Sequence, residues 1–159
     1  MKHCIPLNWP SDIIYSNNTE QKDISFKYTL EGVELRKIDD KNHILDGEYG
    51  VFSTKNWKTF DIIGCYTGEL VKNIPGKYIA RLYCSKNDNY WGLDAEKVGN
   101  ETRFINDYRN IAKEPNVVYS KTIVNGKRCI IVITKNDIGV GEEILSDYGK
   151  DYWNYWNLM

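Results

Sequence analysis

Apolar and polar residues alternate over short stretches of this chain, which is typical of β-strands. Asn125-Gly126 is the dipeptide of a tight β-hairpin. Residues 72–99 have a mixed pattern, and no long stretch repeats with the 3.6-residue period of a helix. The sequence therefore predicts a mainly β fold with few short helices. The strands are expected at 24–28, 33–36, 51–52, 61–66, 117–119, 121–124 and 129–134.

The chain is long enough for one domain and too short for two ordinary ones, at 159 residues. Residues 1–22 are rich in Asn, Ser, Pro and Asp, and we expect an irregular N-terminal arm that packs on the domain or frays. Residues 23–159 then form the domain, which ends in an aromatic tail. No apolar run has the length of a signal peptide or a membrane span. We expect a nuclear or cytoplasmic protein that is neither secreted nor bound to a membrane.

The net charge is close to zero, at −1, which argues against direct nucleic-acid binding over a broad surface. The charge is unevenly placed, because residues 136–159 hold five acidic residues and one lysine. This acidic end suits a basic partner such as a lysine-rich peptide. A solvated acidic face explains it equally well.

The four cysteines are widely spaced, at positions 4, 65, 84 and 129, with no Cys-x-x-Cys pair. The histidines are His3 and His43. A structural zinc site needs four ligands at short paired spacings, so we expect no metal. Three of the cysteines have apolar or aromatic neighbours and are expected to be reduced packing residues.

Three segments combine glycines, polar residues and aromatic residues: 46–52 with 64–70, 99–108 with Pro115-Asn116, and 137–149. In this order and spacing they resemble the SET domain, the fold of most protein lysine methyltransferases. The resemblance covers about residues 24–153. Its most specific part is R-F-I-N at 103–106 followed by G-E-E-I-L-S-D-Y-G at 141–149. It implies short curled sheets and a knot-like crossing, in which the segment of Tyr148 threads beneath the loop of Asn106.

The resemblance also implies a reaction. In this family S-adenosylmethionine and the substrate lysine enter from opposite faces and meet in a narrow tunnel. Methyl transfer from a sulfonium to a neutral amine needs alignment more than proton chemistry. Tyrosine rings attract both cations and help to exclude water.

Three tyrosines match tunnel positions of the family. Tyr148 falls on the main catalytic tyrosine and is counted with the cofactor site as well. Tyr66 falls on a second tyrosine beside the lysine, and Tyr119 on a third that often helps to set the number of methyl groups added. The alternative for each is an ordinary core position, which is the better explanation for most of the twelve tyrosines.

Cofactor contacts are implied in the same way. The turn of Glu48, Tyr49 and Gly50 is expected to present backbone groups to the methionine part of the donor, because glycine permits close approach. Tyr78 matches, more loosely, a tyrosine near the donor. Asn106 matches the asparagine whose side chain holds the amino acid end of the donor.

Several positions depart from the family pattern. Asp107 stands where the family usually has a histidine whose backbone reaches the adenine, and Glu48 stands in place of the first glycine of the Gly-x-Gly turn. The cysteine-rich zinc segment that follows some SET domains is absent, so the tail from Tyr152 to Trp156 is expected to close the lysine channel. Within this tail, Trp153 either stacks beside the adenine or, as we favour, fastens the terminus.

Four further motif residues are assigned structural roles. Arg103 and Phe104 are expected to be architectural, and Glu142 and Glu143 are expected to be structural or part of an acidic rim.

The sequence thus predicts a protein-lysine N-methyltransferase that uses S-adenosylmethionine, with histone tails as the leading substrate class. One alternative is a weak or inactive SET module that binds a basic peptide, suggested by Asp107 and Glu48. A second is a small strand-rich interaction domain whose motif matches are coincidental.

Overall fold

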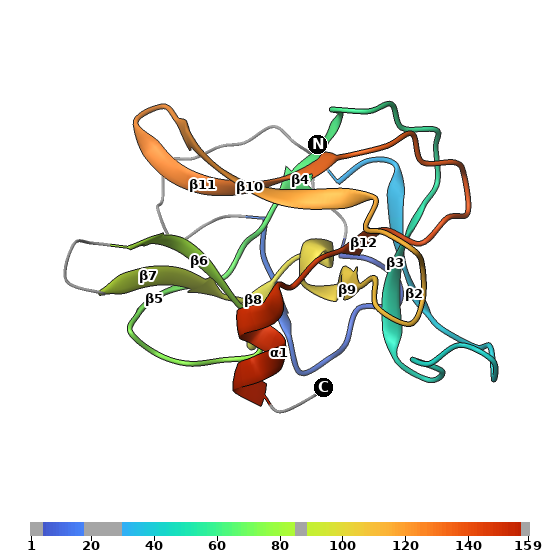
Figure 1. The fold of residues 1–159 in the computed structure, drawn as a ribbon, viewed down its shortest axis with the longest axis horizontal. Helices are drawn as coiled ribbons and strands as arrows, with labels where there is room; N and C mark the ends of the chain where they lie inside the picture. Colours follow the sequence, from blue (N-terminus) through green and yellow to red (C-terminus); the bar gives the residue numbers. More distant parts are fainter. Residues whose placement is uncertain (1–4, 18–29, 85–88, 157–159) are drawn as a thin grey trace.

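The computed structural model describes residues 5–17, 30–84 and 89–156. Its described part is built mainly of short strands, which confirms the predicted fold class (Figure 1). The strand expected at 24–28 and the boundary expected after residue 22 lie outside these residues. In chain order the elements are β1 (Ile14–Tyr15), β2 (Val33–Lys37), β3 (Tyr49–Ser53), β4 (Ile62–Cys65), β5 (Glu69–Lys72), β6 (Ile79–Cys84), β7 (Tyr90–Asp94), β8 (Val98–Gly99), the 3-10 helix η1 (Glu101–Phe104), β9 (Asn106–Asp107), β10 (Val117–Val124), β11 (Lys127–Thr134), β12 (Leu145–Ser146) and α1 (Lys150–Trp156).

One three-stranded sheet has the order β10–β11–β4, and all its neighbours are antiparallel. The β10–β11 hairpin turns at the predicted dipeptide, where Asn125 and Gly126 have φ of 49° and 76°. Both central residues of a type I′ turn need positive φ, and its twist matches that of the paired strands. The turn therefore sets the register in which Tyr119 pairs with Val132.

A second three-stranded sheet has the order β5–β7–β6, and its strands β6 and β7 lie in the stretch with a mixed pattern. Its alternation is weak because the pairing of β6 with β7 shifts between Arg81 and Tyr83. Leu82 and Leu93 from this sheet pack in one buried cluster with Tyr66 and Ile130. This cluster joins the two three-stranded sheets.

The main core cluster gathers strands and loops from both halves of the chain. Tyr119 packs against this cluster and also against the one between the two sheets. A predicted channel residue therefore lies where the two clusters meet. The buried members are Val51, Trp57, Ile63, Ile105, Val117, Val132, Ile138 and Ile144.

The described part of the N-terminal arm packs on the domain. Strand β1 pairs in parallel with β8, with Ile14 opposite Val98. The Trp9 ring meets the Tyr15 and Phe104 rings edge to face, with centroids 4.9 and 5.4 Å apart. These contacts place the arm beside η1, which leads into β9.

The C-terminal segment passes between two other parts of the chain. On one side β12 pairs in parallel with β9. On the other side Asn116 donates its backbone N–H to Leu145 O at 3.0 Å and its Nδ2 to Glu143 O at 2.8 Å. This is the threading expected from the resemblance. The aromatic tail then forms α1, which lies below the β10–β11 hairpin and beside the β5–β7–β6 sheet in Figure 1.

Two buried cysteines, Cys65 and Cys129, are free thiols that pack with Ile131, and Cys84 is exposed. Within residues 5–17, 30–84 and 89–156, no three His, Cys, Asp or Glu side chains are grouped as a metal site would require. In the same part of the chain, none of the helices combines the length and the apolar character needed to cross a membrane.

Candidate active site

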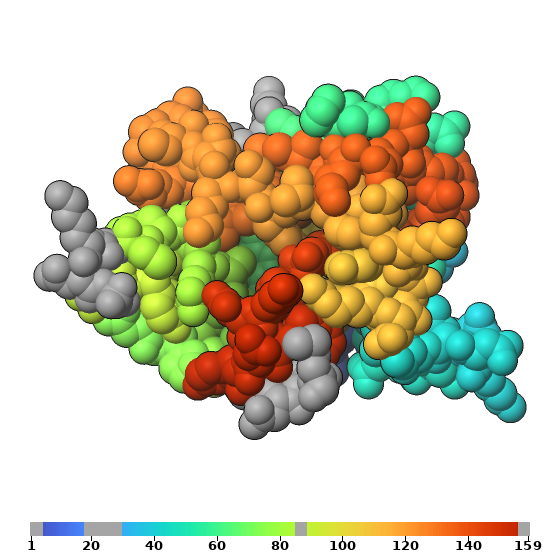
Figure 2. Space-filling view, in the orientation of Figure 1, coloured from blue at the N-terminus to red at the C-terminus, as the bar shows by residue number. Residues whose placement is uncertain are grey.

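An open cavity of about 1640 Å³ lies between the two three-stranded sheets and α1. Figure 2 shows the surface hollowed between the yellow-green strands, the orange hairpin and the red helix. Gly50 and Asp107 are buried and do not line this cavity. The other predicted site residues do line it: Glu48, Tyr49, Tyr66, Tyr78, Asn106, Tyr119 and Tyr148.

The three tyrosines assigned to the channel are held in the same way. Each hydroxyl donates its hydrogen to a backbone carbonyl. A phenol has one hydrogen to donate and two lone pairs, so each oxygen keeps the ability to accept. The pairs are Tyr66 with Tyr78 O at 2.5 Å, Tyr119 with Thr102 O at 2.8 Å, and Tyr148 with Ile105 O at 2.8 Å.

Burial raises the pKa of all three phenols above the ordinary value. Burial is the largest cause for each of them. For Tyr119 the next causes are the nearby phenols of Tyr148 and Tyr66. Removing a phenolate from water is costly, and neighbouring negative charges add to that cost. All three tyrosines are therefore neutral at physiological pH.

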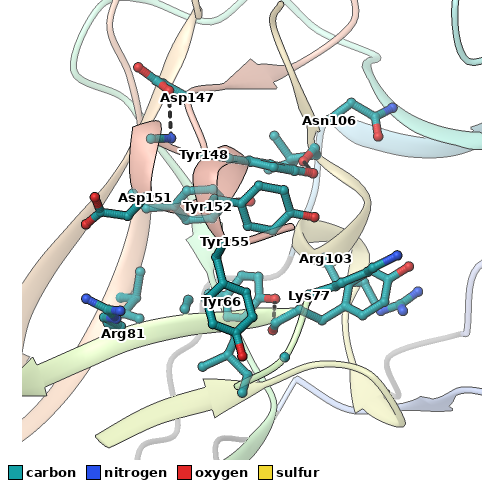
Figure 3. Close-up of a pocket in the computed structure, with 18 of the residues that line it drawn as sticks. Tyr66, Lys77, Arg81, Arg103, Asn106, Asp147, Tyr148, Asp151, Tyr152 and Tyr155 are labelled. Carbon is teal, nitrogen blue, oxygen red and sulfur yellow. Dashed lines mark hydrogen bonds between the residues drawn. The ribbon is translucent and has the colours of Figure 1, made fainter. Parts of the chain in front are cut away.

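Elements from distant parts of the chain bring these rings together. The Tyr66 ring, just after β4, meets the Tyr119 ring of β10 edge to face, with centroids 5.6 Å apart. The Tyr148 ring, just after β12, meets the Tyr152 ring of α1 with centroids 4.8 Å apart. Figure 3 shows Tyr66, Tyr148 and Tyr152 gathered in the cavity. The tail thus adds Tyr152 to the wall of the cavity.

Asn106 is prepared to accept a hydrogen bond on the cavity wall. Its Nδ2 donates to Tyr49 O and to Glu143 Oε1, both at 3.0 Å. Both amide hydrogens are therefore used. Its Oδ1 forms no hydrogen bond within the described part of the chain, so this oxygen is available to a ligand with an N–H group.

Glu143 and His43 support Asn106 from behind. Glu143 Oε2 lies 3.1 Å from His43 Nε2, and His43 Nδ1 accepts the Leu45 N–H at 3.1 Å. Because Nδ1 accepts, the ring proton is on Nε2 and points at the carboxylate. A Cβ at Gly50 would come within 2.7 Å of Glu143 Oε1. Gly50 therefore makes room for Glu143, a role that the motif by itself did not show.

Arg103 has the architectural position expected of it. Its Nε donates to Ala95 O at 2.6 Å, and its guanidinium lies 4.2 and 4.4 Å from the Tyr78 and Phe104 ring centres. Cation–π contacts of this kind hold aromatic rings in place. Arg103 thereby positions Tyr78 at the edge of the cavity.

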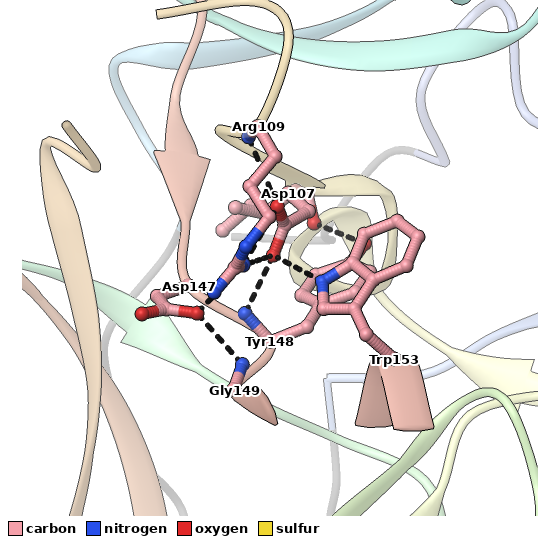
Figure 4. A network of polar contacts seen from close by, with 7 residues as sticks. Asp107, Arg109, Asp147, Tyr148, Gly149 and Trp153 are labelled. Atoms are coloured by element: carbon pink, nitrogen blue, oxygen red, sulfur yellow. Dashed lines mark hydrogen bonds and ion pairs between the residues drawn. The ribbon is translucent and has the colours of Figure 1, made fainter. Parts of the chain in front are cut away.

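Asp107 fastens the C-terminal segment, as Figure 4 shows. Its Oδ2 accepts from the backbone N of Tyr148 at 2.8 Å, from Arg109 Nη1 at 2.7 Å and from Trp153 Nε1 at 3.3 Å. Arg109 Nη1 also contacts Asp147 Oδ1 at 2.8 Å. Trp153 does not line the cavity, so its indole fastens α1 to β9, the role that we favoured. The buried aspartate in the place of the usual histidine is thus the centre of a polar network that extends to the surface through Arg109 and Asp147.

A mainly β scaffold with a threaded C-terminal segment and a tyrosine-lined cavity is the arrangement of a SET fold. The sequence profile of the SET domain family matches residues 48–149, and the chain belongs to this family. The match excludes the alternative that the motif matches are coincidental.

Similar proteins include the histone-lysine N-methyltransferase set1 of Dictyostelium discoideum, 29% identical over 110 residues, which are 64% of this chain and 7% of the relative. The H3 lysine-4 specific histone-lysine N-methyltransferase of Schizosaccharomyces pombe is 32% identical over 108 residues, 62% of this chain and 11% of the relative. The chain therefore spans a small part of the curated relatives that it matches. In the crystal structure of the Chaetomium thermophilum polycomb repressive complex 2 (PRC2), one chain is similar with a TM-score of 0.60 and 26% identity, over 75% of this chain and 15% of that chain.

Proposed function

We propose that this chain is a protein-lysine N-methyltransferase that uses S-adenosylmethionine, with histone tails as its leading substrate class and the nucleus as its place of action. Membership of the SET domain family and the names of the relatives support this proposal. The observation that carries it is the set of three neutral phenols, Tyr66, Tyr119 and Tyr148, each anchored to a backbone carbonyl in the cavity that Asn106 also lines.

The cavity fits the methyl donor at the Asn106 side. The free Oδ1 of Asn106 is a suitable acceptor for an α-ammonium group, and the neighbouring turn of Glu48 and Tyr49 can add backbone contacts. The Tyr148 and Tyr152 rings offer aromatic faces to a sulfonium. The donor would supply the methyl group from its positively charged sulfur. As the S–C bond breaks and an N–C bond forms, the sulfonium would become a neutral thioether.

The three phenol oxygens act on the substrate amine. Their hydrogens are directed at backbone carbonyls, so the oxygens present lone pairs to the amine, and two of them at a time can accept its two N–H groups. This holds the lone pair of nitrogen in one direction, the alignment that a direct displacement requires. Because the phenols are neutral, they orient the amine and do not remove its proton. The amine therefore loses that proton to solvent before transfer.

Titration calorimetry with S-adenosylmethionine, together with a labelled-methyl assay on a panel of histones read by mass spectrometry, tests the proposal. Donor binding together with methyl-lysine supports it. Binding of a basic histone peptide without donor binding would instead support the inactive SET module suggested by Asp107 and Glu48. The Asp107 network favours the enzyme, since it holds the Tyr148 backbone in place.

A further inference from the structure

Most acidic side chains of the C-terminal region have partners inside the molecule. Of its five acidic side chains, Asp151 is the one with no hydrogen bond or ion pair inside the described part of the chain, and it lines the cavity next to Lys150. The other four are engaged: Asp137 with Lys58, Glu142 with the Gly139 N–H, Glu143 with Asn106 and His43, and Asp147 with Arg109. Two of the five, Asp137 and Asp147, are therefore paired with a permanent cation.

Two exposed cations line the same cavity without such partners. Arg81 is on β6, an edge strand of its sheet, and Lys121 is on β10, an edge strand of the other three-stranded sheet. Neither forms an ion pair with any residue that the structure describes. The Arg81 guanidinium is supported by the Tyr90 ring, whose centre is 5.1 Å away. Lys150 and Asp151, adjacent at the start of α1, also line the cavity.

Both cations lie away from the predicted donor side. Strand β10 begins beside the threaded segment and runs toward the hairpin tip, so Lys121 is farther from Asn106 than Tyr119 is. Lys121 and Tyr119 are two positions apart in a strand and so share a face, about 7 Å apart. In Figure 3 Arg81 lies across the tyrosines from Asn106, whereas Lys77 and Arg103 lie on the Asn106 side.

We infer that Arg81 and Lys121 form a subsite for an acidic side chain next to the target lysine. This inference rests on the proposed function. An extended peptide advances about 3.3 Å per residue, so a carboxylate that reaches Lys121 belongs within about two residues of the lysine held at Tyr119. Guanidinium geometry matches a carboxylate, and both cations remain solvated. The subsite therefore selects among lysines according to their flanking residues.

The experiment uses the full chain, labelled S-adenosylmethionine and a peptide library with a central lysine and varied flanking residues. Asp and Glu are expected to be enriched within two positions of the methylated lysine. In matched peptides, Glu in place of Gln should raise kcat/KM about two- to fivefold, the effect of an exposed charge pair. Screening by salt should reduce this preference. A library with no acidic enrichment would overturn the inference.

Substitutions of Arg81 and Lys121 test whether these two cations cause the preference for acidic flanking residues. Arg81→Gln combined with Lys121→Gln should abolish it, and Arg81→Glu should shift the enrichment toward Lys and Arg. Lys113→Gln makes the same charge change at an exposed residue outside the cavity and should keep the preference of the wild type. A double variant that folds and retains the acidic preference would also overturn the inference.

A binding measurement separates this inference from the proposed function. Fluorescence anisotropy compares peptides that flank the lysine with Glu or with Lys, on the wild type and on the double variant. If the library is not methylated but the Glu-flanked peptide binds more tightly to the wild type alone, the proposed function fails and the subsite stands. Methylation and binding without any preference would leave the function standing and refute the subsite.

Discussion

The carboxylate of Asp107 accepts the backbone N–H of Tyr148 at 2.8 Å. The bond joins β9 to the residue expected to contact both reactants. The same oxygen holds Arg109 and Trp153, so one buried carboxylate fixes the segment of Tyr148 and the helix that follows it. The position at which the family usually has a histidine is therefore coupled here to the geometry of the channel.

Asp107→Asn should destabilise the protein by about 1–3 kcal/mol, because the amide cannot accept from all the donors that the carboxylate satisfies. The urea midpoint measures this change, and kcat should fall with it. Asp147→Asn is the matched control, since Asp147 contacts the same Arg109 Nη1 but is exposed and should contribute less than about 1 kcal/mol. Equal effects of the two variants would contradict a special role for Asp107.

Tyr148→Phe should lower kcat by on the order of 10²-fold, because the amine loses an orienting acceptor. The ring and its contact with Tyr152 are kept, so donor affinity should change little, while loss of the hydrogen bond to Ile105 O should cost about 1–3 kcal/mol of stability and leave the fold intact. Tyr83→Phe removes a hydroxyl outside the cavity and is expected to leave the rate unchanged. An undiminished rate for Tyr148→Phe in a labelled-methyl assay would reject its catalytic role.

Glu143→Gln should weaken S-adenosylmethionine binding by about 1–3 kcal/mol, because one amide oxygen cannot accept from both Asn106 and His43. Asn106→Ala should have an effect of the same size. The rate at saturating donor should change less than the dissociation constant does for Glu143→Gln, since the tyrosines stay in place. Glu142→Gln is the control, and titration calorimetry is the measurement. A dissociation constant that Glu143→Gln leaves unaltered would refute the supporting role.

The methylation rate should rise with pH up to about pH 10, because the reactive amine is the neutral form of a lysine with a pKa of about 10.4. Burial raises the pKa of Tyr66 and Tyr148, so their ionisation should not limit the rate in that range. A rate profile from pH 7 to 10 on a fixed peptide tests this. A decline within that range, without unfolding, would show that one of these phenols ionises.

The raised pKa values of the buried phenols also predict that the folded protein loses stability at alkaline pH. The folded state favours the protonated phenols, whereas an unfolded chain releases their protons near pH 10. Above that pH the unfolded state binds fewer protons than the folded state, so the free energy of unfolding falls as pH rises. Urea unfolding followed by circular dichroism at pH 8 and pH 10.5 should show a lower midpoint at the higher pH. Tyr66→Phe should reduce that difference.

Much of the fold was readable from local pattern. Alternating strands, the Asn125-Gly126 turn and the motifs at 103–106 and 141–149 depend on neighbours in sequence, where backbone preferences and periodicity act directly. The β5–β7–β6 sheet was not predicted, because a shift in pairing at Leu82 interrupts the alternation. The helix α1 in the aromatic tail was also not predicted, because no long stretch of the sequence repeats with the 3.6-residue period of a helix.

By itself, the sequence determined that the chain is a mainly β protein of the SET domain family, and which tyrosines are candidates for its chemistry. Tertiary structure decided how these groups are supported: His43 meets Glu143 across 100 positions, Asp107 holds Trp153, and Arg81 and Lys121 line one cavity from two sheets. The physical reason is that packing brings together residues that are far apart in the chain. Packing therefore decides which charged and polar groups find a partner and which remain available to a ligand. Composition counts the acidic residues at the C-terminus, but only the folded arrangement shows which of them, such as Asp137 and Asp147, have a cation beside them.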